Sequence, residues 1–358
     1  MMFTVAMVAA IVTSVFVPFD REYWGYFDLK TLSCLFCILA VVCALKNVNF
    51  FYVLASEIVK RFSNIRICTI ALVYITFIGS MFITNDMALI TFLPLGFFVL
   101  SSTGQRQHMA YLFVLQNIAA NLGGMLAPFG NPQNLFLFTK YNIPVSEFVE
   151  IMLPPFVASM ILLTLCCLVI KPEPLKIIPA DTEINRKQTI ICFLLFAFSI
   201  AVVFRLVPYP IGLGAVLITL LITDRDALKS VDYPLLGTFA AFFVFSGNMA
   251  RIPAIKTCFS LLLSKSTLAV SALSCQFMSN VPAAILLSQF TGDYKSLLLG
   301  VNIGGMGTLI ASLAGLITYR EYLKHEPDGS ARFIGLFSGL GFGFLAVLLG
   351  LEYLPALV

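Results

Sequence analysis

Charged residues are scarce in this sequence. They make up 11% of its 358 residues, whereas apolar residues make up 59%. Soluble domains carry about one quarter charged residues, and so few charges could not cover the surface of a soluble protein of this length. The composition therefore excludes a soluble enzyme, a nucleic-acid-binding protein and a secreted disulfide scaffold. Because the apolar segments are long, it indicates a helical membrane protein rather than a β-barrel.

Histidine is almost absent, since only His108 and His325 occur. Both fall in charged connections, which argues against a histidine-based metal or hydrolase site. Ser279, a serine inside an apolar run, has no histidine in any predicted span to activate it. We therefore expect a protein that is not an enzyme and needs no cofactor, with bound Na⁺ left open.

Targeting and disulfide signals are lacking as well. The N-terminus has no basic region and no cleavage motif, so residues 3–18 are predicted to be a retained span. All nine cysteines lie in or beside apolar segments, where a thiol packs as a small hydrophobic group. We expect these thiols to be inert.

Long apolar runs are what the sequence has in excess. Two of them, 66–101 and 252–290, are too long for one crossing and hold polar residues in the middle, so each is predicted to be a re-entrant hairpin. With the N-terminus in the cytoplasm, the cytoplasmic connections carry 14 of the 22 Lys and Arg residues, which agrees with the positive-inside rule. We expect an integral protein of the cytoplasmic (inner) membrane. The predicted apolar segments are 3–18, 28–46, 66–101, 108–140, 149–170, 188–204, 206–223, 231–249, 252–290, 296–318 and 333–352.

Three blocks of sequence occur twice in the same order. The pairs are FITNDMALITFLPL (82–95) with FMSNVPAAILLSQ (277–289), NLGGMLAPFGN (121–131) with NIGGMGTLIAS (302–312), and FDLKTLSCLF (27–36) with VDYPLLGTFA (231–240). An odd number of predicted crossings separates the copies, which turns the second copy upside down. Inverted repeats with interrupted helices are typical of secondary transporters, whose site lies between the repeats.

This pattern predicts an all-α polytopic membrane protein built from two inverted-topology repeats. Each repeat holds a re-entrant helical hairpin and an interrupted transmembrane helix. The predicted division is an N-terminal span and interfacial segment (1–27), a first inverted repeat (28–170), a linker with connecting spans (171–230) and a second inverted repeat (231–358).

Polar residues interrupt the apolar helices at four places. Irregular backbone inside a bilayer is tolerated only around a cavity, a substrate or an ion, because its polar groups cannot be left unpaired in hydrocarbon. Helix ends at such breaks present N–H groups to anions and carbonyl groups to cations. The predicted binding residues form two half-sites: Thr84, Asn85, Asp86, Asn131 and Asn134 in the first, and Ser279, Asn280, Thr308 and Ser312 in the second.

Asp86 is the only carboxylate inside an apolar span. Burying an acid there costs about 2.5–3.5 kcal/mol or more, so Asp86 is predicted to bind an ion or to carry a proton. A structural alternative is that Asn85 or Asp86 caps the second arm of the hairpin.

Simpler roles stay open for other motif residues. The pairs Gly123–Gly124 and Gly304–Gly305 could serve close helix packing or let the backbone approach a substrate. Asp28 and Asp232 begin spans and are predicted to be helix N-caps.

The matched blocks resemble those of the ion transporter superfamily, which includes arsenite efflux permeases, one type of sodium/proton antiporter, citrate–metal carriers and divalent anion/sodium symporters. ITNDMALITFLPL and FMSNVPAAILL resemble its two hairpin tips. NLGGMLAPFGNPQNLFLF and VNIGGMGTLIASLAGLI resemble its two interrupted helices. The resemblance covers about 28–318 and implies the superfamily's architecture rather than one cargo.

The sequences of the two hairpin tips differ from the Ser-Asn-Thr sequence that the divalent anion symporters carry at both tips. The first reads Thr84-Asn85-Asp86 and the second reads Ser279-Asn280-Val281. Because both asparagines are kept, the resemblance implies Na⁺ sites at Asn85 and Asn280. Asp86 adds negative charge, which suits an anion only when a cation binds too. Homodimers are common among the anion symporters, so a homodimer also stays open.

We therefore expect a secondary active transporter that moves a small anion, a carboxylate or an oxyanion, with Na⁺ or H⁺ by alternating access. Two alternatives remain. One is a Na⁺/H⁺ antiporter that uses Asp86, and the other is an arsenite or antimonite efflux permease. The expected partners are the anion, the coupling ion and the lipid bilayer, with no nucleic acid.

Overall fold

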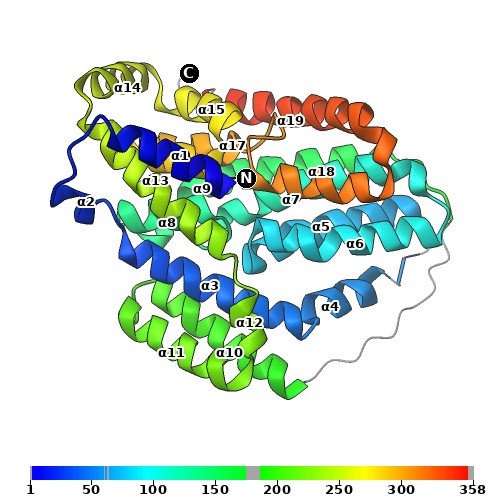
Figure 1. Ribbon diagram of the computed structural model, residues 1–358. Coiled ribbons are helices and arrows are strands. Elements are labelled where there is room, and N and C mark those ends of the chain that lie inside the picture. Colours follow the sequence, from blue (N-terminus) through cyan, green and yellow to red (C-terminus); the bar gives the residue numbers. More distant parts are fainter. Residues whose placement is uncertain (1, 60, 63, 175–185, 354–358) are drawn as a thin grey trace.

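The computed structural model describes residues 2–59, 61–62, 64–174 and 186–353. Over these ranges the chain is helical and forms no strand beyond one isolated bridge between Asn64 and Pro174. Eight of the helices are long and apolar enough to cross a membrane, which confirms the all-α polytopic fold (Figure 1). The helices are α1 Met2–Ser14, α2 Glu22–Gly25, α3 Leu29–Asn47, α4 Phe50–Val59, α5 Ile65–Ile83, α6 Asn85–Ser102, α7 Met109–Gly123, α8 Pro132–Lys140, α9 Val145–Leu168, α10 Arg186–Val203, α11 Tyr209–Thr223, α12 Arg225–Lys229, α13 Tyr233–Arg251, α14 Pro253–Lys265, α15 Thr267–Met278, α16 Asn280–Leu287, α17 Tyr294–Ile303, α18 Leu313–His325 and α19 Ser330–Tyr353, with short 3₁₀ turns at Arg106–His108, Gly124–Leu126 and Pro327–Gly329.

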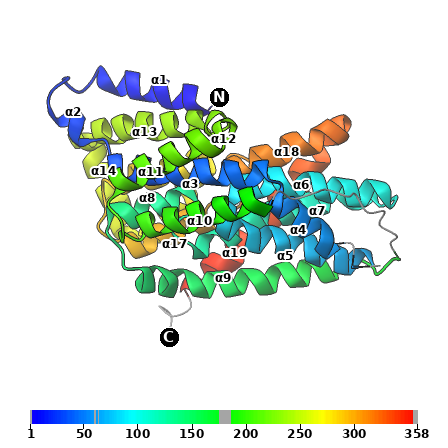
Figure 2. The same ribbon diagram turned by 90° about the horizontal axis from the view of Figure 1, so that it is seen from below.

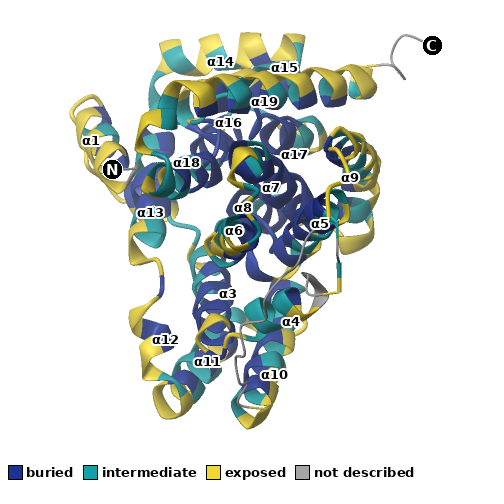
Figure 3. Ribbon diagram, turned by 90° about the vertical axis from the view of Figure 1, so that its right-hand side faces the viewer, coloured by how far each residue is buried: buried dark blue, intermediate teal, exposed yellow. Residues whose placement is uncertain are grey.

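Helix α7 lies at the centre of the molecule. All of its residues except Tyr111 are buried, and Figure 3 shows it enclosed by other helices. A helix that is apolar on every face can be buried on every face, and the few polar residues of α7 find partners inside. Gln116, for example, donates to the Thr76 hydroxyl (3.1 Å) and to the Phe92 carbonyl (3.2 Å).

Helices at the periphery expose apolar faces. Helix α9 leaves a stripe exposed at helical spacing: Leu153, Val157, Ile161, Leu165 and Leu168. Such a face suits lipid rather than water. Helix α1 covers α13 at one edge, and α9 lies at the opposite edge (Figure 2). A separate group is formed by α10 and α11, which pack on α3.

The two long apolar runs both contain a hairpin. Residues 66–101 divide into α5 and α6, which are joined at Thr84 and packed side by side (Figure 1). Both arms are long enough to cross a bilayer, so the re-entrant course stays a prediction. Residues 252–290 divide into three helices. Helix α14 stands apart, and the second hairpin consists of α15 and α16, joined at Ser279.

Two predicted segments need correction. The stretch between the predicted segments 28–46 and 66–101 was assigned to a cytoplasmic connection, and its residues Phe50–Val59 form a further helix, α4. Their sequence, FFYVLASEIV, is apolar enough to pack on the hairpin helices α5 and α6. The expected span 3–18 is shorter than predicted, because α1 ends at Ser14. Residues 175–185, near the start of the predicted linker segment 171–230, lie outside the described residues.

Each interrupted helix packs on the first arm of a hairpin through a glycine. A Cβ added to Gly123 would lie 2.0 Å from the Phe77 carbonyl oxygen of α5. A Cβ added to Gly304 would lie 2.7 Å from the Ala272 Cα of α15. The packing role is therefore confirmed for these two glycines. Their neighbours face polar groups instead: Gly124 lies against the Asn131 side chain, and Gly305 lies against the Asn280 side chain.

We predict that Gly123→Ala lowers the unfolding free energy by about 1–3 kcal/mol, because the new methyl group forces α7 away from α5. The matched control is Gly214→Ala on α11, where no atom lies within 4 Å of an added Cβ. Alanine should be neutral or stabilising there. Thermal unfolding in detergent checks both variants, and equal midpoints for the two would contradict the packing argument.

Candidate functional site

The two hairpin tips have the same unusual backbone. Thr84 has φ 65° and Ser279 has φ 74°, in a left-handed region that residues with a Cβ seldom adopt. Each residue ends one helix and precedes the next. In each tip the following asparagine accepts a bond on its side-chain oxygen from the next backbone N–H, at 2.9 Å in both cases. The tips are therefore built alike, as their matched sequences predicted.

Each tip docks on the break of an interrupted helix. The Asn85 N–H donates to the Gly130 carbonyl (3.2 Å), and the Asn280 N–H donates to the Ala311 carbonyl (2.9 Å). The acceptor carbonyls immediately precede Asn131 and Ser312, which are the N-caps of α8 and α18. These bonds satisfy backbone groups that would otherwise be unpaired in an apolar interior.

A cluster of amide side chains joins the two halves of the chain. Asn302 of α17 accepts on its Oδ1 from the side-chain amides of Asn131 and Gln133, both at 3.3 Å. Its Nδ2 donates to the Asn134 Oδ1 at 2.6 Å. Asn302 thus links α17 to the start of α8, and both hydrogen-bonding groups of its side chain are used.

Gln276 stabilises the break of the second half. Its Nε2 donates to the carbonyls of Gly304 and Met306, both at 2.8 Å. Its Oε1 accepts from the Thr308 N–H at 3.0 Å, and the Thr308 hydroxyl donates to the Gln276 carbonyl at 3.1 Å. Thr308 is therefore engaged in holding the break.

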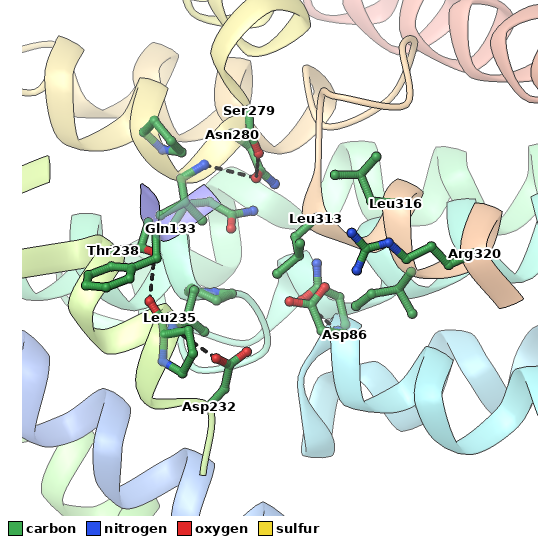
Figure 4. A pocket seen from close by; sticks show the side chains of 17 residues that line it. Asp86, Gln133, Asp232, Leu235, Thr238, Ser279, Asn280, Leu313, Leu316 and Arg320 are labelled. Atoms are coloured by element: carbon green, nitrogen blue, oxygen red, sulfur yellow. Dashed lines mark hydrogen bonds between the residues drawn. The ribbon is translucent and has the colours of Figure 1, made fainter. Parts of the chain in front are cut away.

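A cavity of about 200 Å³ lies where the two tips meet. We call it the tip cavity. It is enclosed by both hairpin tips, by the first residues of α8 and α13, by Phe3 of α1 and by one face of α18 (Figure 4). Its polar lining consists of Asn85, Asp86, Gln133, Asp232, Thr238, Ser279, Asn280 and Arg320.

The charged groups of the tip cavity are not paired with one another. Arg320 forms no ion pair or hydrogen bond within the described ranges, although it points into the cavity from α18 (Figure 4). The Asp86 Oδ1 is buried and has no hydrogen-bond partner in the described chain. Asp232 accepts from the Leu235 N–H at 2.9 Å, so it caps α13 and lines the cavity at once.

The predicted N-caps are confirmed at both aspartates. Asp28 accepts from the Thr31 N–H at 3.0 Å, as Asp232 does from Leu235. Of the two residues predicted as possible caps of the hairpin's second arm, Asn85 takes this role, because its side-chain oxygen accepts from the Asp86 N–H at 2.9 Å.

The structure gathers part of the predicted site around the cavity. Asn85, Asp86, Ser279 and Asn280 line it. The other predicted residues lie behind its wall or at the breaks: Thr84, Asn131, Asn134, Thr308 and Ser312.

Two of these residues carry free oxygens at matching positions. The Asn131 Oδ1 and the Ser312 Oγ are buried and have no partner among the described residues. Each belongs to the N-cap next to a docked tip. Oxygens of this kind are ligands for hard cations, so they fit the predicted Na⁺ sites near Asn85 and Asn280. The described residues hold no group of three or more His, Cys, Asp or Glu side chains suited to a metal ion.

Several residues of the site escaped the sequence analysis. Gln133 belongs to the motif that contains Asn131 and Asn134, so its place beside them was a usable signal. Arg320 follows the predicted segment 296–318 and was therefore counted in a cytoplasmic connection. Because α18 begins at Leu313, Arg320 is only about two helical turns from the break. For Gln276 and Asn302 the sequence offered a weaker signal, because each is a single amide residue within an apolar helix.

Comparison with known proteins gives a consistent family. Residues 1–291 match the family model described as citrate transporter. An uncharacterized transporter (MJ0456) of Methanocaldococcus jannaschii is 34% identical over 84% of this chain and 82% of its own length. The inner membrane protein YbiR of Escherichia coli K12 is 29% identical over 89% of this chain and 87% of its own.

A shorter match connects the chain to a plant protein. The silicon efflux transporter LSI3 of Oryza sativa subsp. japonica is 30% identical over 45% of this chain and 34% of its own length. The family and two of these relatives are named as transporters rather than as enzymes. Together with the eight helices able to cross a membrane, the match over most of its length shows that the chain is an integral membrane protein of the citrate transporter family.

Proposed function

We propose that this protein is a secondary active transporter that moves a small anion, a carboxylate or an oxyanion, together with Na⁺ or H⁺ by alternating access. The observation that carries the proposal is the tip cavity, which holds the free Arg320 guanidinium and the unpartnered Asp86 carboxylate. The E. coli relative is named an inner membrane protein, which supports the same location here.

Arg320 supplies the group that recognises the anion. A guanidinium is planar and can bind both oxygens of a carboxylate or oxyanion at once. Amide and hydroxyl donors line the same cavity, because Asn280, Gln133 and Ser279 are buried at its wall. This lining suits a small polar anion rather than an apolar solute.

The carboxylates explain why a cation would be required. When both carboxyl groups are ionised, Asp86 and Asp232 bring two negative charges into the tip cavity, and Arg320 brings one positive charge. An anion therefore meets net repulsion until a cation binds. Na⁺ or H⁺ bound near Asp86 removes that repulsion, so anion and cation bind together, which is the basis of coupled transport.

A Na⁺/H⁺ antiporter is the second candidate, and the buried, unpartnered Asp86 Oδ1 favours it. An intramembrane acid without a partner can exchange a proton for a cation. This function needs no organic anion, so the two candidates separate in one reconstituted system. Arsenite belongs in the same substrate screen, because a metalloid efflux permease is predicted as a further alternative and the rice relative is named for silicon efflux.

We predict that Arg320→Gln raises the KM for the transported anion about tenfold or more, since a charge-assisted contact contributes about 1.5–3 kcal/mol. Uptake of labelled citrate, succinate and arsenite into proteoliposomes with an inward Na⁺ or H⁺ gradient measures the effect. Arg332→Gln, which removes an exposed arginine of α19 outside the cavity lining, is the control. An unchanged KM in Arg320→Gln would remove Arg320 from the anion site.

We predict that Asp86→Asn abolishes the dependence of uptake on the cation, because the neutral amide no longer needs charge compensation. The first recording uses vesicles with a trapped pH dye, a clamped potential, a Na⁺ gradient and no organic anion. Proton flux that requires the protein and disappears in Asp86→Asn identifies the antiporter. A second outcome is that no proton flux is recorded and that anion uptake by Asp86→Asn depends on Na⁺ and H⁺ as it does in the wild type. That outcome would contradict the role of Asp86 in coupling.

A further inference from the structure

A second cavity, of about 300 Å³, lies at the other end of α8 and α13. Pro132 and Gln133 at the start of α8 line the tip cavity, whereas Lys140 at its end lines the second cavity. Helix α13 also extends from one cavity to the other. Its first turns reach the tip cavity and its last turns reach the second cavity. Since α13 is 19 residues long and rises about 1.5 Å per residue, the two cavities lie toward opposite ends of a membrane-length helix.

Lys140 is a free cation in this second cavity. Its ammonium group forms no ion pair or hydrogen bond within the described chain, and its recorded contact is with the Phe136 ring, 5.6 Å from the centroid. The side chain is half-buried beside aromatic walls. A cation in such surroundings attracts an anion strongly, because little water screens it.

The other charged groups of the second cavity are already engaged. Arg251 is held by Asp20, Glu22 and the Tyr26 hydroxyl. Its hydrogen bonds lower the pKa of Asp20, so that carboxylate stays ionised and neutralises Arg251. Asp28 has both carboxylate oxygens bonded to Thr31 as the cap of α3. Of the charged side chains that line this cavity, Lys140 alone forms no ion pair or hydrogen bond with the described residues.

Arg320 of the tip cavity lies in a similar place relative to a helix break. Lys140 lies nine residues after Asn131, the N-cap of α8, and Arg320 lies eight residues after Ser312, the N-cap of α18. Each shares its cavity with an N-capping aspartate, Asp28 in one case and Asp232 in the other. Each cavity therefore combines an N-capping aspartate with a cation about two turns beyond a helix break, although the two cations are offset by one residue in the matched repeats.

We propose that Lys140 forms a second anion-binding site, in which the transported anion binds between the tip cavity and the opposite face of the membrane. The inference rests on the proposed anion transport. The ligand belongs to the class that Arg320 binds, a small carboxylate or oxyanion. The two cations would then serve entry from opposite sides, Arg320 on one face and Lys140 on the other.

Chemical labelling tests binding without requiring transport. The purified wild-type protein is reconstituted in vesicles of neutral phosphatidylcholine, so that no anionic lipid competes for Lys140. A membrane-impermeant amine-reactive ester is then added with citrate, succinate or phosphate, or with chloride at matched ionic strength, and modification is read by mass spectrometry. We expect the anion to slow modification of Lys140 in the wild type and in Arg320→Gln, but not of Lys256, an exposed lysine of α14. Equal rates for Lys140 with every anion would overturn the proposal.

Sided transport tests the direction of access. In right-side-out and inside-out vesicles, Lys140→Gln should raise the KM about tenfold for entry from one face only, and Arg320→Gln should raise it from the other face. Lys140→Arg should restore entry. An equal loss from both faces would make Lys140 a structural residue and overturn the proposal. If the wild type moves no anion, the proposed function fails, while protection of Lys140 in the labelling experiment would still support the second site.

Discussion

Two backbone hydrogen bonds hold the centre of this structure together: Asn85 to the Gly130 carbonyl and Asn280 to the Ala311 carbonyl. A hairpin tip and a helix break both leave polar groups unpaired, and hydrocarbon offers no water to satisfy them. When a tip docks on a break, the backbone N–H group of the tip donates to a backbone carbonyl at the break. Because the two docked tips lie close together, their remaining polar side chains face one cavity.

The two halves depend on each other through side chains as well. Asn302 of the second half bonds three amides of the first, and the Thr318 hydroxyl donates to the Asn117 Oδ1 of α7 at 3.1 Å. Buried amides are expensive unless they are satisfied, so these contacts favour one arrangement of the halves. The Asp86 Oδ1 and the Arg320 guanidinium are the charged groups of the tip cavity that this network leaves without a partner among the described residues.

The sequence predicted the features that depend on pattern. Apolar runs with polar centres identified both hairpins, and the matched blocks located the tips and the breaks. The N-cap role of Asp28 and Asp232 followed from their place at the start of apolar helices. The family resemblance, drawn from four motifs, agrees with the match of residues 1–291 to the citrate transporter family.

The sequence could not show which residues lie close together in space. Asp232 and Asp86 are far apart in the chain and share a cavity only because α13 starts beside the first tip. Arg320 appeared to follow a full span, since the point where α18 begins depends on the break before it. Thr308 carried a suitable hydroxyl, but Gln276 engages it, and that contact depends on how α15 packs against α17.

The glycine contacts have a consequence for how the molecule can move. No Cβ fits between Gly123 and α5, or between Gly304 and α15, and the residue before each glycine, Leu122 or Ile303, is large and buried. A slide that brought Leu122 or Ile303 to the place of its glycine would therefore produce a clash. In the proposed transport cycle, a hairpin tip that moves would therefore carry α7 or α17 with it.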